Sequence, residues 1–177
     1  MNNSYDYIKN EINPNICTGA VSKRFFEKLE NGNLTRDEDP KSHFCCYFLP
    51  YNPETRQVFI VHHKKSGLWL APGGHIDRGE DLIQTLNREI EEELGIKGKI
   101  KEKIKPFLLT VTPIDNPVQS CKEHLDFWYR FQTDGSEFNV DSREFHDTKW
   151  LSLADTRKLV TDRPNLDALD KMEQLFQ

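Results

Sequence analysis

The sequence of 177 residues lacks a hydrophobic run long enough to cross a membrane, which needs about 18 consecutive apolar residues. Its first ten residues are polar and contain no apolar segment of the kind that a secretory signal requires. We therefore expect a cytoplasmic protein with no membrane partner. A chain of this length can bury a core of its own without disulfide or metal staples.

Cysteine is scarce, and its spacing excludes the usual frameworks. The four cysteines form no C-x-x-C pair, and two of them, Cys45 and Cys46, are adjacent. Adjacent residues of a strand point to opposite faces, so these two thiols cannot serve one site together. The pattern predicts reduced, structural thiols, and it argues against a disulfide framework or a zinc site.

Excess positive charge is also missing, because the formal net charge is -5. Long nucleic acids need a basic face for their phosphates, so the composition argues against that class of partner. A small phosphorylated substrate remains compatible with this charge, since a bound cation can reverse its sign locally.

The apolar pattern predicts strands between an N-terminal and two C-terminal helical segments. We expect a loose or helical lead-in over residues 1–16, a helix over 18–30, and a loop over 64–77 with at most a short strand at 68–70. The expected strands cover residues 44–49, 57–63, 98–105, 107–111, 125–132 and 148–151, and the expected helices cover 79–94, 152–160 and the segment after 162. This order favours an α/β or α+β sandwich around a mixed sheet.

The helix expected over residues 79–94 carries an unusual group of acids. Glu89, Glu92 and Glu93 have the i, i+3 and i+4 spacing that places them on one face. They repel one another, and they lie at the helix end where the dipole disfavours negative charge. A hard divalent cation, which prefers oxygen ligands, would relieve both problems. The alternative is a solvated acidic helix face.

Two neighbouring features favour the metal-binding interpretation. Arg88 can pair with Glu92 or hold an adjacent glutamate in a fixed rotamer. Before the helix, Gly73 and Gly74 let the backbone approach a ligand closely, so that a main-chain carbonyl could contribute to a metal site. A glycine loop leading to clustered carboxylates suits phosphate chemistry.

The segment from Gly74 to Ile96 resembles the Nudix box. That pattern is Gly, five residues, Glu, seven residues, Arg-Glu, an aliphatic residue, any residue, Glu-Glu, any residue, Gly and an aliphatic residue. Every defined position is filled, by Gly74, Glu80, Arg88, Glu89, Ile90, Glu92, Glu93, Gly95 and Ile96. A weaker resemblance to a bacterial Nudix subgroup extends over about residues 43–155.

The resemblance implies an α/β/α sandwich and cleavage of a nucleoside diphosphate linked to another group, with Mg²⁺ or Mn²⁺. We expect residues 1–42 to form an N-terminal helical extension and residues 43–177 to form the Nudix domain, including the C-terminal helices. Carried onto this chain, Glu89, Glu92, Glu93 and the Gly73 carbonyl are metal ligands. One of these glutamates could also be the base, and Arg88 orients them. Glu80 supports the loop or reaches the metal through water, and Gly95 has a structural role in the box.

Several residues outside the acidic face are candidates for binding the substrate. Lys64 and Lys65 flank the glycine loop and could meet phosphate, although they could equally be exposed loop lysines. Gly74 and His75 belong to the loop itself, where His75 could contact the substrate or the metal, or could instead make a plain hydrogen bond. His124 begins the aromatic strand and could line the pocket or only pair across strands.

The sequence leaves the substrate open, because the specificity signatures of well-defined Nudix subgroups do not appear. A Nudix domain that only senses a nucleotide is one alternative, although such domains usually lose box glutamates. An enzyme of the isopentenyl diphosphate isomerase type is another, but it needs a cysteine where this chain has Gly73. The oligomeric state is open as well, with a homodimer through the N-terminal segment or the sheet as one option.

Overall fold

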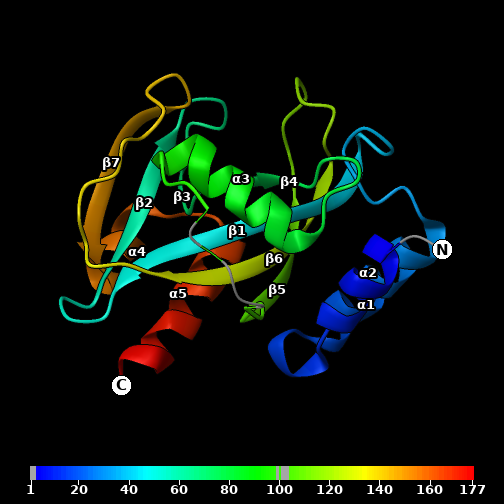
Figure 1. Ribbon diagram of the computed structural model, residues 1–177, viewed down its shortest axis with the longest axis horizontal. Helices are drawn as coiled ribbons and strands as arrows, with labels where there is room; N and C mark the ends of the chain where they lie inside the picture. The colour runs from blue at the N-terminus through cyan, green and yellow to red at the C-terminus, as the bar shows by residue number, and fades with distance from the viewer. Residues whose placement is uncertain (1–2, 99, 101–103) are drawn as a thin grey trace.

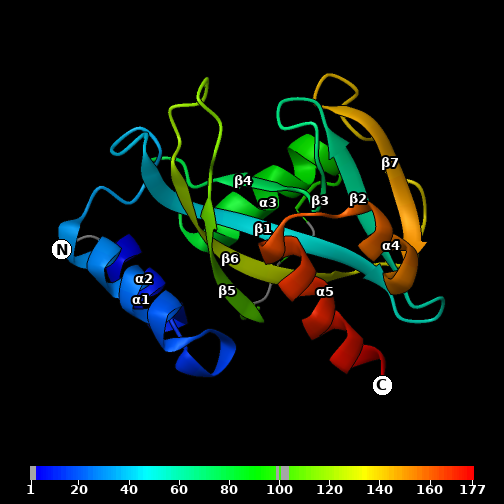
Figure 2. The same cartoon turned by 180° about the vertical axis from the view of Figure 1, so that it is seen from behind.

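The computed structural model describes residues 3–98, 100 and 104–177. The chain folds into a mixed sheet with helices on both faces (Figures 1 and 2). The helices are α1 Asn3–Glu11, α2 Gly19–Asn31, α3 Leu82–Leu94, α4 Leu153–Leu159 and α5 Arg163–Phe176, with a 3-10 turn at Pro14–Ile16. The strands are β1 Ser42–Asn52, β2 Gln57–His63, β3 Trp69–Leu70, β4 Gly73–His75, β5 Leu108–Pro113, β6 Glu123–Gln132 and β7 Phe145–Ser152.

The sheet is built around β1, the longest strand. Its main path runs in the order β3-β2-β1-β6-β5, while β4 pairs with β1 and β7 pairs with β2. Strands β1 and β6 are parallel, and the other pairings are antiparallel. The expected hairpin between the first two strands is confirmed, since Tyr51 pairs with Val58 across the turn. The expected mixed sheet is confirmed as well.

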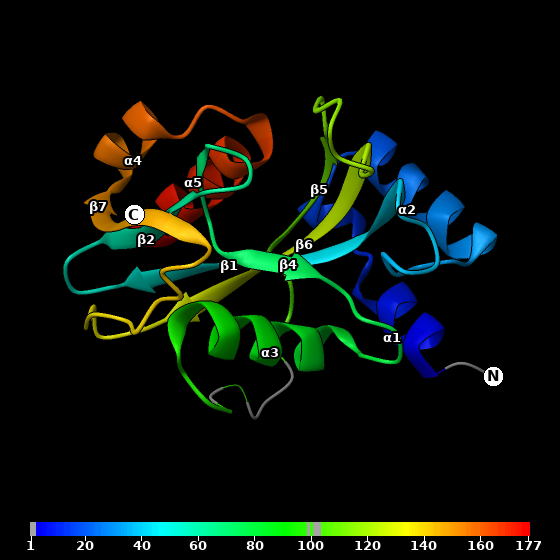
Figure 3. The same cartoon turned by 90° about the horizontal axis from the view of Figure 1, so that it is seen from above.

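Alternation along β1 divides the core into two layers. Phe44, Cys46 and Phe48 belong to the cluster that packs against α3, and Phe25 of α2 joins the same cluster. On the opposite face, Leu49 packs with residues of the C-terminal helix α5, such as Leu169. Figure 3 shows α3 on one side of the sheet, with α4 and α5 on the other. The expected sandwich is therefore the observed architecture.

Two details of the expected secondary structure are wrong. The segment 64–77 contains a second strand, β4, in addition to the short strand β3. Helix α3 begins at Leu82 rather than at residue 79, because the Asp81 side chain caps it by accepting hydrogen bonds from the amides of Ile83 and Gln84. The strand expected over 98–105 lies partly outside the described residues, and its described residues are not in a strand.

In the described part of the chain, none of the helices has the length and apolar character that a membrane span requires. The expected termini of the other elements agree with the structure to within a few residues. Thr18, Ser152 and Asp162 each accept a hydrogen bond from a backbone amide in the first turn of the helix that follows. Gly95, with φ of 69°, ends α3 in the left-handed conformation that glycine adopts without strain.

Candidate active site

Strand β4 delivers the glycine loop to the end of α3, and close packing there depends on glycine. A Cβ added at Gly73 would lie 2.3 Å from the Cys46 carbonyl oxygen, and one added at Gly74 would lie 2.3 Å from Glu89 Oε1. Both separations are far below van der Waals contact. The two glycines therefore allow β4 to lie between β1 and the acidic face of the helix.

The carboxylates that the spacing predicts on one helix face differ strongly in exposure. Glu89 and Glu93 are buried, at 7% and 4% exposure, while Glu92 is exposed. Glu93 Oε2 accepts a hydrogen bond of 2.7 Å from the amide of Gly73, which ties the helix to the glycine loop. The same amide–carboxylate contact aligns the loop backbone with the acidic face.

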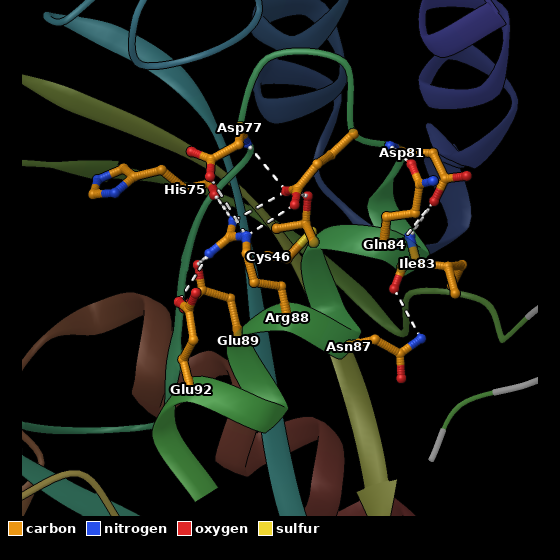
Figure 4. Close-up of polar contacts among 12 residues, drawn as sticks. Cys46, His75, Asp77, Asp81, Ile83, Gln84, Asn87, Arg88, Glu89 and Glu92 are labelled. Atoms are coloured by element: carbon orange, nitrogen blue, oxygen red, sulfur yellow. Dashed lines mark hydrogen bonds and ion pairs between the residues drawn. The ribbon is translucent and has the colours of Figure 1, made fainter. Parts of the chain in front are cut away.

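Arg88 connects the loop to the helix through a set of charge-assisted hydrogen bonds (Figure 4). Its Nε donates to Glu80 Oε1 at 2.9 Å and its Nη1 donates to Glu89 Oε1 at 2.7 Å. Nη2 donates to the carbonyl oxygen of His75 at 2.8 Å, and Nη1 also contacts Glu92 Oε2 at 3.2 Å. The guanidinium thus fixes both the loop and two of the three glutamates.

Glu80 holds this arrangement from the side of the loop. Besides its two contacts with Arg88, it accepts hydrogen bonds from the Thr85 hydroxyl and from the amide of Asp77. Burial alone would raise the pKa of Glu80, but these hydrogen bonds outweigh burial and hold the pKa below its ordinary value. Glu80 is therefore ionised, and its carboxylate holds the Arg88 guanidinium in place.

Burial disfavours the ionised form of both Glu89 and Glu93. Burial raises the pKa of Glu89 to about 7, even though Arg88 acts in the opposite direction. Burial and the nearby charge of Glu89 raise the pKa of Glu93 well above its ordinary value. Within the described residues, Glu93 has no cationic partner. A bound cation would let both carboxylates ionise together.

These carboxylates open onto a pocket of about 880 Å³. The pocket gathers every residue that the sequence analysis proposed for catalysis, metal binding or substrate binding: Lys64, Lys65, Gly73, Gly74, His75, Arg88, Glu89, Glu92, Glu93 and His124. The two box residues with predicted structural roles, Glu80 and Gly95, lie outside its lining. Lys64 donates to the carbonyl oxygen of Ser142 at 2.7 Å, so it is anchored at the rim.

Further pocket residues went unnoticed in the sequence. Arg36 comes from the segment before β1, and Arg143 and Glu144 come from the loop before β7. The charge of Glu144 contributes to the raised pKa values of Glu89 and Glu93, which places a fourth carboxylate near the acidic face. No periodicity or motif marks these loop residues, so only the folded chain brings them to the site.

The histidines at the floor of the pocket are neutral. Burial and neighbouring imidazoles lower the pKa of His75 to about 2 and that of His124 to about 3. Next to them on β6, Asp126 is fully buried and accepts hydrogen bonds from the hydroxyls of Thr110 and Thr112. His124 pairs with His43 across the strands, and it also lines the pocket.

Comparison with known proteins agrees with this architecture. A family model described as NUDIX domain matches residues 39–169. A solved structure of the NUDIX domain of Shewanella oneidensis NrtR, complexed with ADP ribose, superposes with a TM-score of 0.60 at 18% identity and covers 76% of this chain and 88% of that chain. The chain belongs to the Nudix family.

Curated relatives match this chain either over part of their own length or at low sequence identity. Nudix hydrolase 6 of Arabidopsis thaliana is 39% identical over 107 residues, which are 58% of this chain and 36% of that protein. ADP-ribose pyrophosphatase of Bacillus subtilis is 26% identical over 158 residues, which are 86% of this chain and 83% of that protein. Another Bacillus subtilis relative is matched over only 60% of its length. The chain thus spans well under two thirds of some relatives that it matches.

Proposed function

We propose that this chain is a metal-dependent pyrophosphohydrolase that cleaves the diphosphate bond of a nucleoside diphosphate linked to another group. The observation that carries the proposal is the buried pair Glu89 and Glu93, which faces a pocket large enough for a nucleotide-sized ligand and lacks enough positive charge among the described residues. The names of relatives, such as the ADP-ribose pyrophosphatase of Bacillus subtilis, agree with this class of reaction.

The donor set fits Mg²⁺ or Mn²⁺. Carboxylates of Glu89, Glu92 and Glu93, together with the carbonyl oxygen of Gly73, are the hard oxygen ligands that these ions prefer. When bound, such an ion would neutralise charge that develops on the phosphate oxygens during cleavage. Glycine at positions 73 and 74 lets the loop backbone lie directly against the ligand residues, because a side chain there would collide with Cys46 or Glu89.

The chain's own residues supply the remaining requirements of the reaction. Arg88 holds Glu89 and Glu92 in position, so the carboxylates need little rearrangement when the substrate binds. Lys64, Lys65 and Arg36 line the pocket and can attract the negative phosphates. A glutamate of the acidic face, which lines the pocket, accepts the proton of the attacking water.

The decisive experiment measures phosphate and monophosphate release from a panel of diphosphate compounds, with Mg²⁺ and with Mn²⁺. The panel spans nucleoside triphosphates, oxidised nucleotides, nucleotide sugars, ADP-ribose, dinucleotides and coenzyme A. We expect metal-dependent release that falls by at least about 100-fold in Glu93→Gln, because loss of a direct ligand should cost more than loss of an outer partner.

Glu91→Gln is the matched control, because Glu91 lies on the same helix but is exposed and contacts Lys97. It should retain wild-type turnover. A folded Glu93→Gln variant with full activity would refute the assignment of the acidic face. Metal binding without turnover on any compound would contradict the hydrolase proposal and favour a domain that senses nucleotides.

A further inference from the structure

Three strands bring a second group of metal-ligating side chains together on the face of the sheet opposite α3. In the parallel register of β1 and β6, His43 pairs with His124, and in the antiparallel register of β1 and β4, Cys45 pairs with His75. Because His43 and Cys45 are two residues apart, they point to the same face of β1. Their neighbour Cys46 points the other way, into the core against α3.

The three imidazoles form a nearly equilateral triangle. Their ring centroids are separated by 4.8 Å for His43–His75, 5.1 Å for His43–His124 and 5.0 Å for His75–His124. Three histidines bound to one tetrahedral ion through bonds of about 2.0 Å would place their ring centres about 5 Å apart. The rings therefore already have the separation that a shared ion would give them.

Cys45 completes a set of four ligands. One donor atom from each of His43, Cys45, His75 and His124 lies within 4.8 Å of all the others. Neighbouring ligand atoms around a tetrahedral zinc ion are about 3.5 Å apart, so the donor atoms need to contract by about 1 Å.

Burial leaves this group without adequate hydrogen bonds. His124 is 7% exposed, and within the described residues neither of its ring nitrogens has a hydrogen-bond partner. A buried imidazole with two unsatisfied nitrogens is costly, and such exceptions in folded proteins call for a physical explanation. A metal ion would satisfy one nitrogen of His124 directly.

His43 is already oriented as a ligand would be. Its Nδ1 lies 2.9 Å from the carbonyl oxygen of Asp39, and a carbonyl can only accept, so Nδ1 carries the proton. Nε2 then keeps its lone pair, which accepts only a weak hydrogen bond from the Cys121 thiol, with Sγ at 3.8 Å. A backbone carbonyl that holds the second nitrogen of a ligating histidine is the usual outer support of a zinc site.

We propose that His43, Cys45, His75 and His124 bind one zinc ion in a four-coordinate, structural site, of which His75 and His124 also line the pocket. Nitrogen and sulfur donors select zinc over magnesium, whereas the oxygen donors of the acidic face have the opposite preference. The two metal sites are thus chemically distinct. Figure 3 shows β4 beside β1, and β1 in turn pairs with β6. A zinc ion held by these three strands fixes the strand that carries Gly73 and Gly74.

Titration of the metal-free protein with Co²⁺, in the presence of saturating Mg²⁺ to occupy the carboxylates, tests the proposal. Tetrahedral cobalt with a thiolate ligand gives visible ligand-field bands and a thiolate-to-cobalt charge-transfer band. We expect one equivalent of Co²⁺ to produce both signals, and one equivalent of Zn²⁺ to abolish them. Elemental analysis of protein purified without chelator should likewise find one zinc per chain.

Matched variants assign the ligands. Cys45→Ser should lose the charge-transfer band, and His124→Ala should bind Zn²⁺ at least about 100-fold more weakly. Cys17→Ser and His62→Ala, which replace the same residue types outside the cluster, should bind Zn²⁺ and Co²⁺ as the wild type does.

Cys121→Ser should keep the charge-transfer band too, although the Cys121 Sγ lies 3.8 Å from His43 Nε2. Glu93→Gln should bind zinc normally, which separates this site from the hydrolytic one.

The wild-type titration decides the proposal even where a variant fails to fold, and circular dichroism identifies such a variant. Absence of stoichiometric Zn²⁺ and Co²⁺ binding in the wild type would overturn the proposal. So would cobalt binding without a thiolate band, or binding that survives unchanged in both Cys45→Ser and His124→Ala. A band that disappears in Cys121→Ser instead of Cys45→Ser would overturn the ligand set.

Discussion

Arg88 is the side chain that relates the loop to the acidic helix. Its guanidinium donates to Glu80, to Glu89 and to the carbonyl oxygen of His75, all at 2.7–2.9 Å. A planar fork can serve three acceptors in different directions, whereas an ammonium group offers a single point of charge. Arginine at this position therefore positions the carboxylates, and Glu80 neutralises it from the outer side.

The substitution Gly74→Ala should displace the Glu89 carboxylate without unfolding the protein, so it tests whether the position of Glu89 matters for activity. The added Cβ would overlap the Glu89 carboxylate, at 2.3 Å from Oε1 and 2.5 Å from Cδ, and the carboxylate must move aside. Gly74 does not have a positive φ, so alanine fits its backbone. We expect turnover to fall by about 10- to 100-fold, because displacing a reactive group by about 1 Å has an effect of this size.

Steady-state kinetics and thermal unfolding of the same preparation check this prediction. Gly19→Ala is the control, since its Cβ meets nothing within 4 Å and it begins helix α2, far from the pocket. Full activity in Gly74→Ala would show that the position of Glu89 does not limit the reaction. An activity loss that merely follows a large loss of stability would also contradict the explanation.

At the scale of elements, the sequence predicts α3 well and β4 not at all. Helix α3 has regular apolar spacing, with Leu86, Ile90 and Leu94 buried on one side, and Gly95 ends it. The three residues of β4 include two glycines, which have little preference for strands. Pairing with Cys45, Cys46 and Tyr47 of β1 imposes the extended conformation, and that pairing is tertiary information.

The candidate site likewise contains some residues that the sequence predicts and others that only the fold brings together. The acidic face, Arg88 and the glycine loop were predictable because they are close in sequence and have helical spacing. Arg36 and Glu144 were not predictable, because they reach the pocket from distant loops. The histidine cluster was missed for a related reason: its members are spread over three strands, and only their register brings them together.

Asn165 connects helix α5 to the turn between β3 and β4. Its Oδ1 accepts a buried hydrogen bond of 2.7 Å from the amide of Ala71, while its Nδ2 donates to Asp162. Asn165→Ala leaves the buried Ala71 amide unsatisfied, and we expect the free energy of unfolding to fall by about 1–3 kcal/mol. Denaturant unfolding measures this difference.

Gln174→Ala provides the comparison, because Gln174 is exposed on the same helix. Its free energy of unfolding should stay within about 0.5 kcal/mol of the wild type. A similar small effect for Asn165→Ala would mean that water or a neighbouring group replaces the lost acceptor, and the proposed connection would then have no energetic importance.

At the scale of the whole molecule, the N-terminal helices share the core of the sheet. Ile8 of α1 and Phe25 of α2 belong to the same buried cluster as Phe44 and Phe127. The division at residue 42 into an extension and a domain stays a prediction, since burial connects the two parts. The family match, which begins at residue 39, describes a shorter unit than this shared core.

An ion pair fastens α2 to the start of β6, and it makes stability depend on pH. Glu123 accepts hydrogen bonds from Arg24 and from the Ser42 hydroxyl. Burial alone would raise the pKa of Glu123, but these bonds outweigh it and hold the pKa below 4.5. The unfolded chain then binds a proton more readily than the native protein does, so the contact stabilises the fold above about pH 4.5 and is lost as the pH falls through the lowered pKa.

Glu123→Gln should therefore lower the free energy of unfolding at pH 7 by about 1 kcal/mol, a figure reduced for the partial exposure of both partners. The difference from the wild type should shrink as the pH falls from about 4.5 toward 3, because the wild-type carboxyl is protonated there and resembles the amide. Glu27→Gln, on the exposed side of α2, should differ little from the wild type at any pH. Denaturant unfolding at several pH values tests this, and a difference that stays constant down to pH 3 would show that the ionised pair does not hold α2 against the sheet.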